Sequence, residues 1–115
     1  MKNIKSLKNN REFNLVYRTG RSIANRTLIM YVRKNDLDYN RLGITVSKKV
    51  GNSIVRHRVT RLIRESYRLN KEKMAQGFDI IVVARNSVKD KGYFEIEGSF
   101  LHLLRLHKIC DKKSQ

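Results

Sequence analysis

The chain has 115 residues, of which 26 are lysine or arginine and 10 are aspartate or glutamate, so its formal net charge is +16. This length suits a single domain over residues 1–115 and excludes a multi-layer enzyme with a deep pocket. Because so strong a positive field repels itself unless a polyanion screens it, the expected partner is nucleic acid.

The N-terminal part of the chain predicts one helix followed by strands. Residues 9–20 read as a helix with Asn9 or Asn10 as the cap at its start and Gly20 at its end. One further short strand fits RSIAN. Residues 27–34 and 41–47 alternate apolar with polar side chains, which is typical of strands with one core face. That face is formed by Leu28, Met30, Val32, Leu42, Ile44 and Val46.

The remaining elements are a long helix, an inner strand and a last helix. A helix from Asn52 to about Asn70 begins with an asparagine cap. The segment FDIIVVA is apolar on both faces, as in an inner strand. A helical spacing then runs from Tyr93 to Ile109, although Gly98 weakens it. The predicted fold is an α+β two-layer sandwich of order α-β-β-α-β-α, plus the short strand.

Positive charge is concentrated in KKVGNSIVRHRVTRLIRES, residues 48–66, around the single acid Glu65. At about 100° per residue, a helix places one group of side chains inward and another outward. The inward group is Val55, Val59, Leu62, Ser66 and Leu69. The outward group, here called the arginine row, is His57, Arg61, Arg64 and Arg68, with Arg56 and Arg58 on its flanks.

The arginine row opposes the stability of its own helix. Like charges three and four residues apart repel by a few tenths of a kcal/mol per pair. An ordinary solvated face is the alternative, but such a face mixes both signs of charge. Phosphate groups reverse the repulsion, because guanidinium groups bind them bidentately and release condensed counterions. The row therefore predicts docking on a polyanion.

Three aromatic residues predict a groove for single-stranded nucleic acid. Phe13 and Tyr17 share the first helix, Tyr31 lies on the mixed face of a strand, and the small residues of GITVS form the floor. Bases stack on such rings with about 1–3 kcal/mol each. The alternative for Phe13 is a place in the core.

Catalytic and metal-binding patterns are absent from the sequence. His57, His102 and His107 have no metal-ligand spacing, and the acids are scattered. No catalytic residue and no metal ligand is expected, so any chemistry belongs to another molecule.

The protein is predicted to be cytoplasmic. No run of about 18 apolar residues and no signal sequence is seen, so no membrane is expected. Cys110 is the one cysteine, which excludes an internal disulfide, fits a reducing compartment and is otherwise assigned no role. Residues 110–115 read as a frayed tail.

Several motifs together resemble one family. They are LKNNREFNLVYRTGRSIANRTLIMYV, then SKKVGN with an Arg-x-Arg core and RLIRE, then FDIIVVAR. This combination resembles the protein subunit of bacterial ribonuclease P along nearly the whole chain. The resemblance implies a fold like domain 2 of ribosomal protein S5, with a left-handed βαβ crossover where the general rule favours a right-handed one.

The resemblance also implies a division of labour. The partners are ribonuclease P RNA and precursor tRNA. The RNA hydrolyses the precursor with Mg²⁺ held mainly by RNA and removes the 5′ leader, and the chain is the accessory endoribonuclease subunit. Phe13, Tyr17 and Tyr31 take the leader. The residues that face the catalytic RNA are Lys48, Lys49, Arg56, His57, Arg58, Arg61, Arg64 and Arg68.

Two positions depart from the family pattern. The usual Arg-Asn-Arg triplet reads Arg56-His57-Arg58, and Thr60 stands where lysine is common. A structural ribosomal protein or a general RNA chaperone fits the size and charge equally well. DNA binding is not expected, because neither a helix-turn-helix nor a dimer signal is seen.

Overall fold

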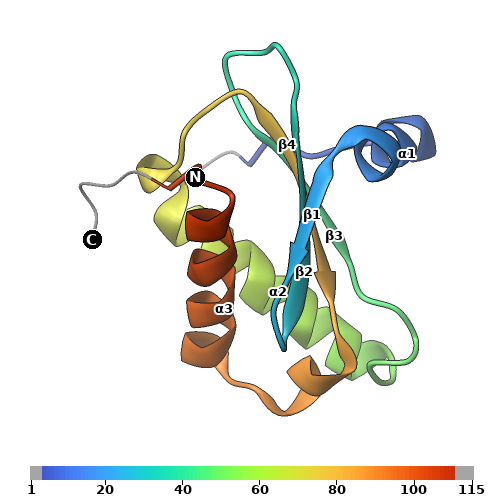
Figure 1. The fold of residues 1–115 in the computed structure, drawn as a ribbon. Helices are drawn as coiled ribbons and strands as arrows, with labels where there is room; N and C mark the ends of the chain where they lie inside the picture. The colour runs from blue at the N-terminus through green and yellow to red at the C-terminus, as the bar shows by residue number, and fades with distance from the viewer. Residues whose placement is uncertain (1–3, 111–115) are drawn as a thin grey trace.

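The computed structural model describes residues 4–110, in which a four-stranded sheet lies between α1 on one side and α2 and α3 on the other (Figure 1). The α+β class and the predicted order of elements, including the short strand, are confirmed. The elements are α1 (Asn10–Thr19), β1 (Arg21–Ala24), β2 (Leu28–Lys34), β3 (Arg41–Thr45), α2 (Ser53–Asn70), β4 (Phe78–Ala84) and α3 (Tyr93–Leu106), with 3₁₀ turns η1 (Lys71–Lys73) and η2 (Asn86–Asp90).

The strand order of the sheet is β1-β2-β4-β3. β4 pairs antiparallel with β2 and parallel with β3, so the doubly apolar segment is an inner strand, as predicted. α2 connects the parallel strands β3 and β4, because a parallel pair needs a long crossover.

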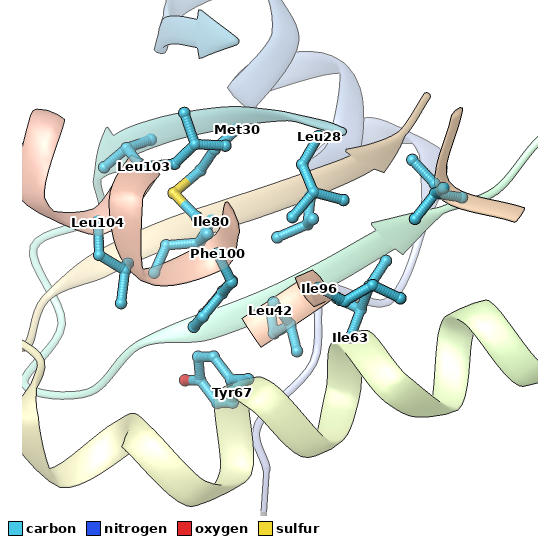
Figure 2. Close-up of a cluster of buried hydrophobic side chains, with 14 of the residues drawn as sticks. Leu28, Met30, Leu42, Ile63, Tyr67, Ile80, Ile96, Phe100, Leu103 and Leu104 are labelled. Carbon is cyan, nitrogen blue, oxygen red and sulfur yellow. The ribbon is translucent and has the colours of Figure 1, made fainter. Parts of the chain in front are cut away.

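The core lies between one face of the sheet and the helices α2 and α3 (Figure 2). The predicted alternation of β2 is confirmed, since Leu28, Met30 and Val32 are buried in this core. α3 contributes apolar side chains at helical spacing, namely Ile96, Phe100, Leu103 and Leu104.

The predicted inward face of α2 is wrong in part. Leu69 is 53% exposed, whereas Ile63 and Tyr67, which the prediction left out, are buried. The reason is tertiary: α2 packs against α3 as well as the sheet, so its buried side is turned toward α3. There the ring of Tyr67 meets that of Phe100 at 6.4 Å.

The helix ends follow local chemistry. The Asn9 side chain caps α1 by accepting from the Glu12 backbone N–H at 3.0 Å. Gly20 ends α1, as predicted. Its φ of −81° is one that any residue can adopt, so backbone conformation does not explain the glycine. Glycine is needed there because a Cβ would lie 2.6 Å from the Val16 carbonyl oxygen.

The last helix, α3, is shorter than the sequence predicts. α3 ends at Leu106, three residues before the predicted end at Ile109. Of the tail predicted at residues 110–115, only Cys110 is described, and it forms an isolated antiparallel bridge with Met74. Residues 111–115 lie outside the described residues. No helix within residues 4–110 is long and apolar enough to cross a membrane.

Candidate nucleic-acid interface

The arginine row lies on the side of α2 that faces away from the core. His57, Arg61, Arg64 and Arg68 are exposed, and the flanking Arg56 and Arg58 are half-buried. The Asn52 side chain caps the helix by accepting from the Val55 N–H at 3.0 Å. The first turn carries no acid, so the positive end of the helix dipole adds to the field of the row.

The side chains of the row differ in how they are held. Arg68 forms an exposed ion pair with Glu65, with 2.6 Å between Nη2 and Oε2. The hydrogen bond from Arg68 lowers the pKa of the Glu65 carboxyl, so both groups of the pair are charged at neutral pH. Within residues 4–110, neither Arg61 nor Arg64 takes part in an ion pair or a hydrogen bond. Their charges are therefore available to a ligand.

The two flanking arginines bind backbone carbonyls. Arg56 Nε donates to the Gly51 carbonyl at 3.2 Å. The Arg58 guanidinium reaches across to the segment before α3, where it donates to the carbonyls of Lys91 at 2.9 Å and Lys89 at 3.3 Å. Arg58 thus has a structural contact that sequence reasoning missed, because its partners lie more than 30 residues away.

A hollow opens on the outer side of α2 and includes most of the row. It is lined by Ser53, Ile54, His57, Arg58, Thr60, Arg61 and Arg64. Lys48 and Lys49 are exposed in the turn that precedes α2, where the Lys49 N–H donates to Ser47 Oγ at 3.3 Å. The basic residues predicted to act together are thereby carried by one helix and the turn before it.

The three predicted groove residues meet on the opposite face of the sheet, under α1. Phe13, Tyr17 and Tyr31 are half-buried around Leu7, Val16 and Ile81. The rings of Tyr17 and Tyr31 meet edge to face with centroids 4.8 Å apart, and Phe13 lies 6.4 Å from Tyr17. The Tyr17 hydroxyl is hydrogen-bonded to Thr45 Oγ1 at 3.2 Å.

Gly43 makes room for one of these rings. A Cβ at this position would lie 2.7 Å from the Phe13 ring. The smooth floor expected from GITVS is thus partly covered by Phe13, and Gly43 is buried. A second hollow at this edge is lined by Ser6, Leu7, Phe13, Leu42, Gly43, Ile44, Thr60 and Arg64. Arg64 of the arginine row and Phe13 of the groove therefore line one hollow.

A buried carboxylate at the start of β4 connects α1 to this face of the sheet. Asp79 in β4 is 1% exposed and accepts from Arg41 Nε and Nη2, both at 2.8 Å. Arg41 also reaches Glu12 of α1 at 3.2 Å. Burial acts to raise the pKa of Asp79, but hydrogen bonds from Arg41 and Asn35 and the nearby positive charges outweigh it, so the pKa is lowered. This network positions α1 over the sheet.

The Asp79 network and the pairing of the N-terminal segment with β3 were not predicted from the sequence. The only signal for the Asp79 network is a single acid inside an apolar strand segment. The N-terminal segment also pairs with β3, where the Leu7 N–H donates to the Leu42 carbonyl at 3.0 Å. That segment is too short to carry a strand pattern. In the described part of the chain, no group of three His, Cys, Asp or Glu side chains is arranged to hold a metal ion.

Comparison with known proteins gives the family. The sequence model described as Ribonuclease P matches residues 1–108. The chain belongs to the ribonuclease P protein family. It is 60% identical over 104 residues to the ribonuclease P protein component of Lachnoclostridium phytofermentans, covering 90% of each chain. It is 52% identical over 109 residues to that of Alkaliphilus metalliredigens, covering 95% of this chain and 98% of the relative.

Solved structures of the family share the fold. The RNase P protein of Staphylococcus aureus has a TM-score of 0.87 and 37% identity, and the match covers 95% of this chain and 100% of the other. The RNase P protein from Thermotoga maritima has a TM-score of 0.82 and 33% identity, over 89% and 96%. The family predicted from the motifs is confirmed, and so is its mixed α+β fold.

Proposed function

We propose that the chain is the protein subunit of ribonuclease P, which binds the RNA subunit and the 5′ leader of precursor tRNA in the cytoplasm. The observation that carries the proposal is the pair of surfaces on opposite faces of one sheet. One is the arginine row on α2, where Arg61 and Arg64 have no ion-pair partner among residues 4–110. The other is the groove of Phe13, Tyr17 and Tyr31. Family membership supports the assignment.

The row and the turn before it serve the RNA subunit. Arg61, Arg64 and His57 offer exposed donors to phosphates, and Lys48 and Lys49 extend the positive surface toward β3. Arg56, Arg58 and Arg68 keep their charge while their guanidinium groups are held in place. Phosphate contacts of this kind set register and orientation rather than sequence preference.

The groove serves the leader. A single strand is held by stacking on aromatic rings inside a positive field, with little dependence on base identity. Only the precursor has a leader, so the groove raises affinity for the substrate and not for the mature product. Hydrolysis is assigned to the RNA subunit with Mg²⁺ held mainly by RNA. The chain's own contribution is to bind both RNAs and neutralise their phosphates.

The alternative of a ribosomal protein or RNA chaperone shares the charge but gives no reason for a specific precursor. Reconstitution with the RNA subunit at low Mg²⁺ tests the proposal. The chain is expected to raise cleavage of precursor tRNA, and equal rates with and without it would overturn the assignment. Co-purification with ribosomal subunits, rather than with one discrete RNA, would favour the alternative.

A paired substitution tests the groove. The double variant Tyr17→Ala with Tyr31→Ala is expected to weaken precursor binding by the holoenzyme. The expected loss is about 1–3 kcal/mol for each base that no longer has a tyrosine ring to stack on. Mature tRNA binding is expected to stay unchanged. Leu106→Ala, at an exposed position near the end of α3, is the matched control. Equal losses for precursor and mature tRNA would contradict the groove assignment.

A further inference from the structure

Phe94 is the most exposed of the large apolar side chains among residues 4–110, at 82%, and Ile54 follows at 78%. A single exposed apolar residue is ordinary in a soluble protein. These two are set apart by where they lie. Ile54 lines the hollow on the outer side of α2, together with Arg58 and Arg61. Phe94 lies in the first turn of α3, just after the segment that Arg58 binds.

The position of Phe94 is well held. The Arg58 guanidinium donates from Nη1 and Nη2 to the Lys91 carbonyl, at 3.3 and 2.9 Å, and ties the segment before α3 to α2. The Gly92 N–H donates to Glu95 Oε1 at 2.9 Å and closes the first turn of the helix. The rings of Tyr93 and Phe94 meet edge to face with centroids 5.4 Å apart. An exposed ring supported in this way loses little conformational entropy when a ligand stacks on it.

The positive charge near Phe94 comes mainly from α2, whose hollow is lined by Arg58, Arg61 and Arg64. The Arg58 guanidinium meets the backbone carbonyls of Lys89 and Lys91 at this corner, and Figure 1 shows η2 beside the N-terminal end of α2. The acids nearby in sequence are Asp90, Glu95 and Glu97; the Glu95 carboxylate accepts from the Gly92 N–H, and the Glu97 carboxylate accepts from Asn70 Nδ2 at 2.9 Å. A flat exposed ring beside a basic surface is the arrangement that binds unpaired nucleobases. A second copy of the chain is disfavoured as the ligand, because two chains that each carry a net charge of +16 repel one another.

We infer that Phe94 is a stacking platform for an unpaired base of the RNA subunit, and that Arg58 is the positioning residue that sets it beside the arginine row. This inference rests on the proposed function. It extends the RNA contact from one helix to a corner formed by α2 and the start of α3. Ile54 lines the same hollow as Arg58, and Phe94 follows the Lys91 carbonyl that Arg58 binds.

Affinity for the RNA subunit tests the platform. Phe94→Ala is expected to weaken binding of the transcribed ribonuclease P RNA between about 5-fold and 150-fold, the range for one lost stacked base. Phe94→Leu is expected to lose a similar factor, since it keeps an apolar side chain without a ring, whereas Phe94→Tyr retains affinity. Leu106→Ala at the other end of α3 serves as control and is expected to bind as the parent does. Unchanged affinity of Phe94→Ala would overturn the inference.

A fluorescence measurement gives an independent readout. The chain has no tryptophan, so Phe94→Trp places the only indole at the platform. Its emission is expected to be quenched by the RNA subunit and not by heparin, a polyanion without bases. Leu106→Trp is expected to show no quenching by the RNA. Equal effects of heparin and RNA, or an emission change with protein concentration alone, would contradict base stacking; the latter would indicate a second copy on the ring.

A double-mutant cycle tests the positioning role of Arg58. Arg58→Lys keeps the charge but loses the fork that binds the carbonyls. Phe94→Ala is expected to weaken RNA binding by a smaller factor in the Arg58→Lys background than in the parent, and independent effects would refute the coupling. If the parent chain itself does not bind the RNA subunit, the proposed function fails. If the parent binds and Phe94 has no effect, only the platform fails.

Discussion

Glycines in this chain meet different local demands at different positions. At Gly20 a Cβ would lie 2.6 Å from the Val16 carbonyl oxygen and 3.0 Å from that of Val32, both rigid backbone atoms. At Gly98, inside α3, a Cβ would meet nothing within 4 Å. Only the first position requires glycine for packing. In α3 glycine leaves the helix with the entropic cost of a flexible residue and no compensating contact.

Gly98→Ala is therefore expected to stabilise the fold by about 0.5–1 kcal/mol, the difference between the two residues in a helix interior. Gly20→Ala is the contrasting variant and is expected to destabilise it. The free energy of unfolding in urea measures both. A loss of stability in Gly98→Ala would show that the exposed side of α3 is not as open as the structure has it.

Removing the buried carboxylate of Asp79 leaves the Arg41 guanidinium without its main partner. We expect Asp79→Ala to lower the free energy of unfolding by about 3 kcal/mol, the low end for a broken buried pair, because Arg41 is partly exposed and keeps Glu12. Asp38→Ala, at an exposed loop position, is the control and is expected to change stability by less than about 0.5 kcal/mol. Urea denaturation of both variants distinguishes a network that holds α1 from a surface pair.

Among the elements, α2 combines two opposing requirements. Its buried side, with Val59, Ile63 and Tyr67, packs into the core. Its outer side carries arginines that repel one another, with only the Arg68–Glu65 pair to offset this within residues 4–110. Tertiary packing therefore stabilises the helix against its own surface charge.

Arg61→Ala is expected to leave stability unchanged or slightly raised, because it relieves repulsion. The same substitution is expected to weaken RNA binding and to make its dependence on salt less steep. The slope of log K against log salt concentration decreases by about 0.7–0.9 for each lost phosphate contact. Arg105→Ala on α3 removes the same charge from an exposed site and is expected to change the slope less. Equal slopes for the two variants would contradict a specific role for the row.

α3 is joined to the sheet by a histidine that favours its neutral form. His107 is buried, and its Nε2 donates to the Met30 carbonyl at 3.0 Å. Burial lowers the pKa of His107 from its usual 6.5 and outweighs the hydrogen bond to the Met30 carbonyl, which acts to raise it; the charge of Arg21 also lowers it. The unfolded chain thus binds a proton at a higher pH than the folded chain, so folding stability is lost as pH falls below about 6.5.

Thermal unfolding followed from pH 7.5 to pH 5 tests this. The parent chain is expected to lose stability on acidification, and His107→Gln, which keeps a donor for the Met30 carbonyl and does not titrate, is expected to lose less. Parallel pH profiles for the two proteins would show that His107 does not contribute.

At the scale of the molecule, the sheet separates the two candidate RNA surfaces. α1 lies on one face of the sheet and α2 on the other (Figure 1). The groove and the row approach each other at the β3 edge, where Phe13 and Arg64 line one hollow. The sheet therefore fixes the separation between the groove and the arginine row.

The separation predicts a pattern of additivity in precursor binding by the holoenzyme. Tyr31→Ala and Arg61→Ala, on opposite faces, are expected to add within about 0.5 kcal/mol. Phe13→Ala and Arg64→Ala, which share a hollow, are expected to couple. Strong coupling of the first pair would mean that the two surfaces do not act independently.

The sequence by itself determined the order of elements, the asparagine caps, the inner strand and the row of arginines. These depend on periodicity and on neighbours a few residues apart, which a linear reading contains. That the three aromatic side chains lie together could also be predicted from the sequence, because Phe13 and Tyr17 share a helical face and Tyr31 alternates with core residues.

Only the tertiary structure decided which side of α2 is buried, how Asp79 is paired, and that Arg58 holds the start of α3. Leu69 was misplaced and Tyr67 missed because α3, far along the chain, covers one flank of α2. Each of these features depends on contacts between residues distant in sequence. Such contacts form only after the helices have packed on the sheet, and no local pattern records them.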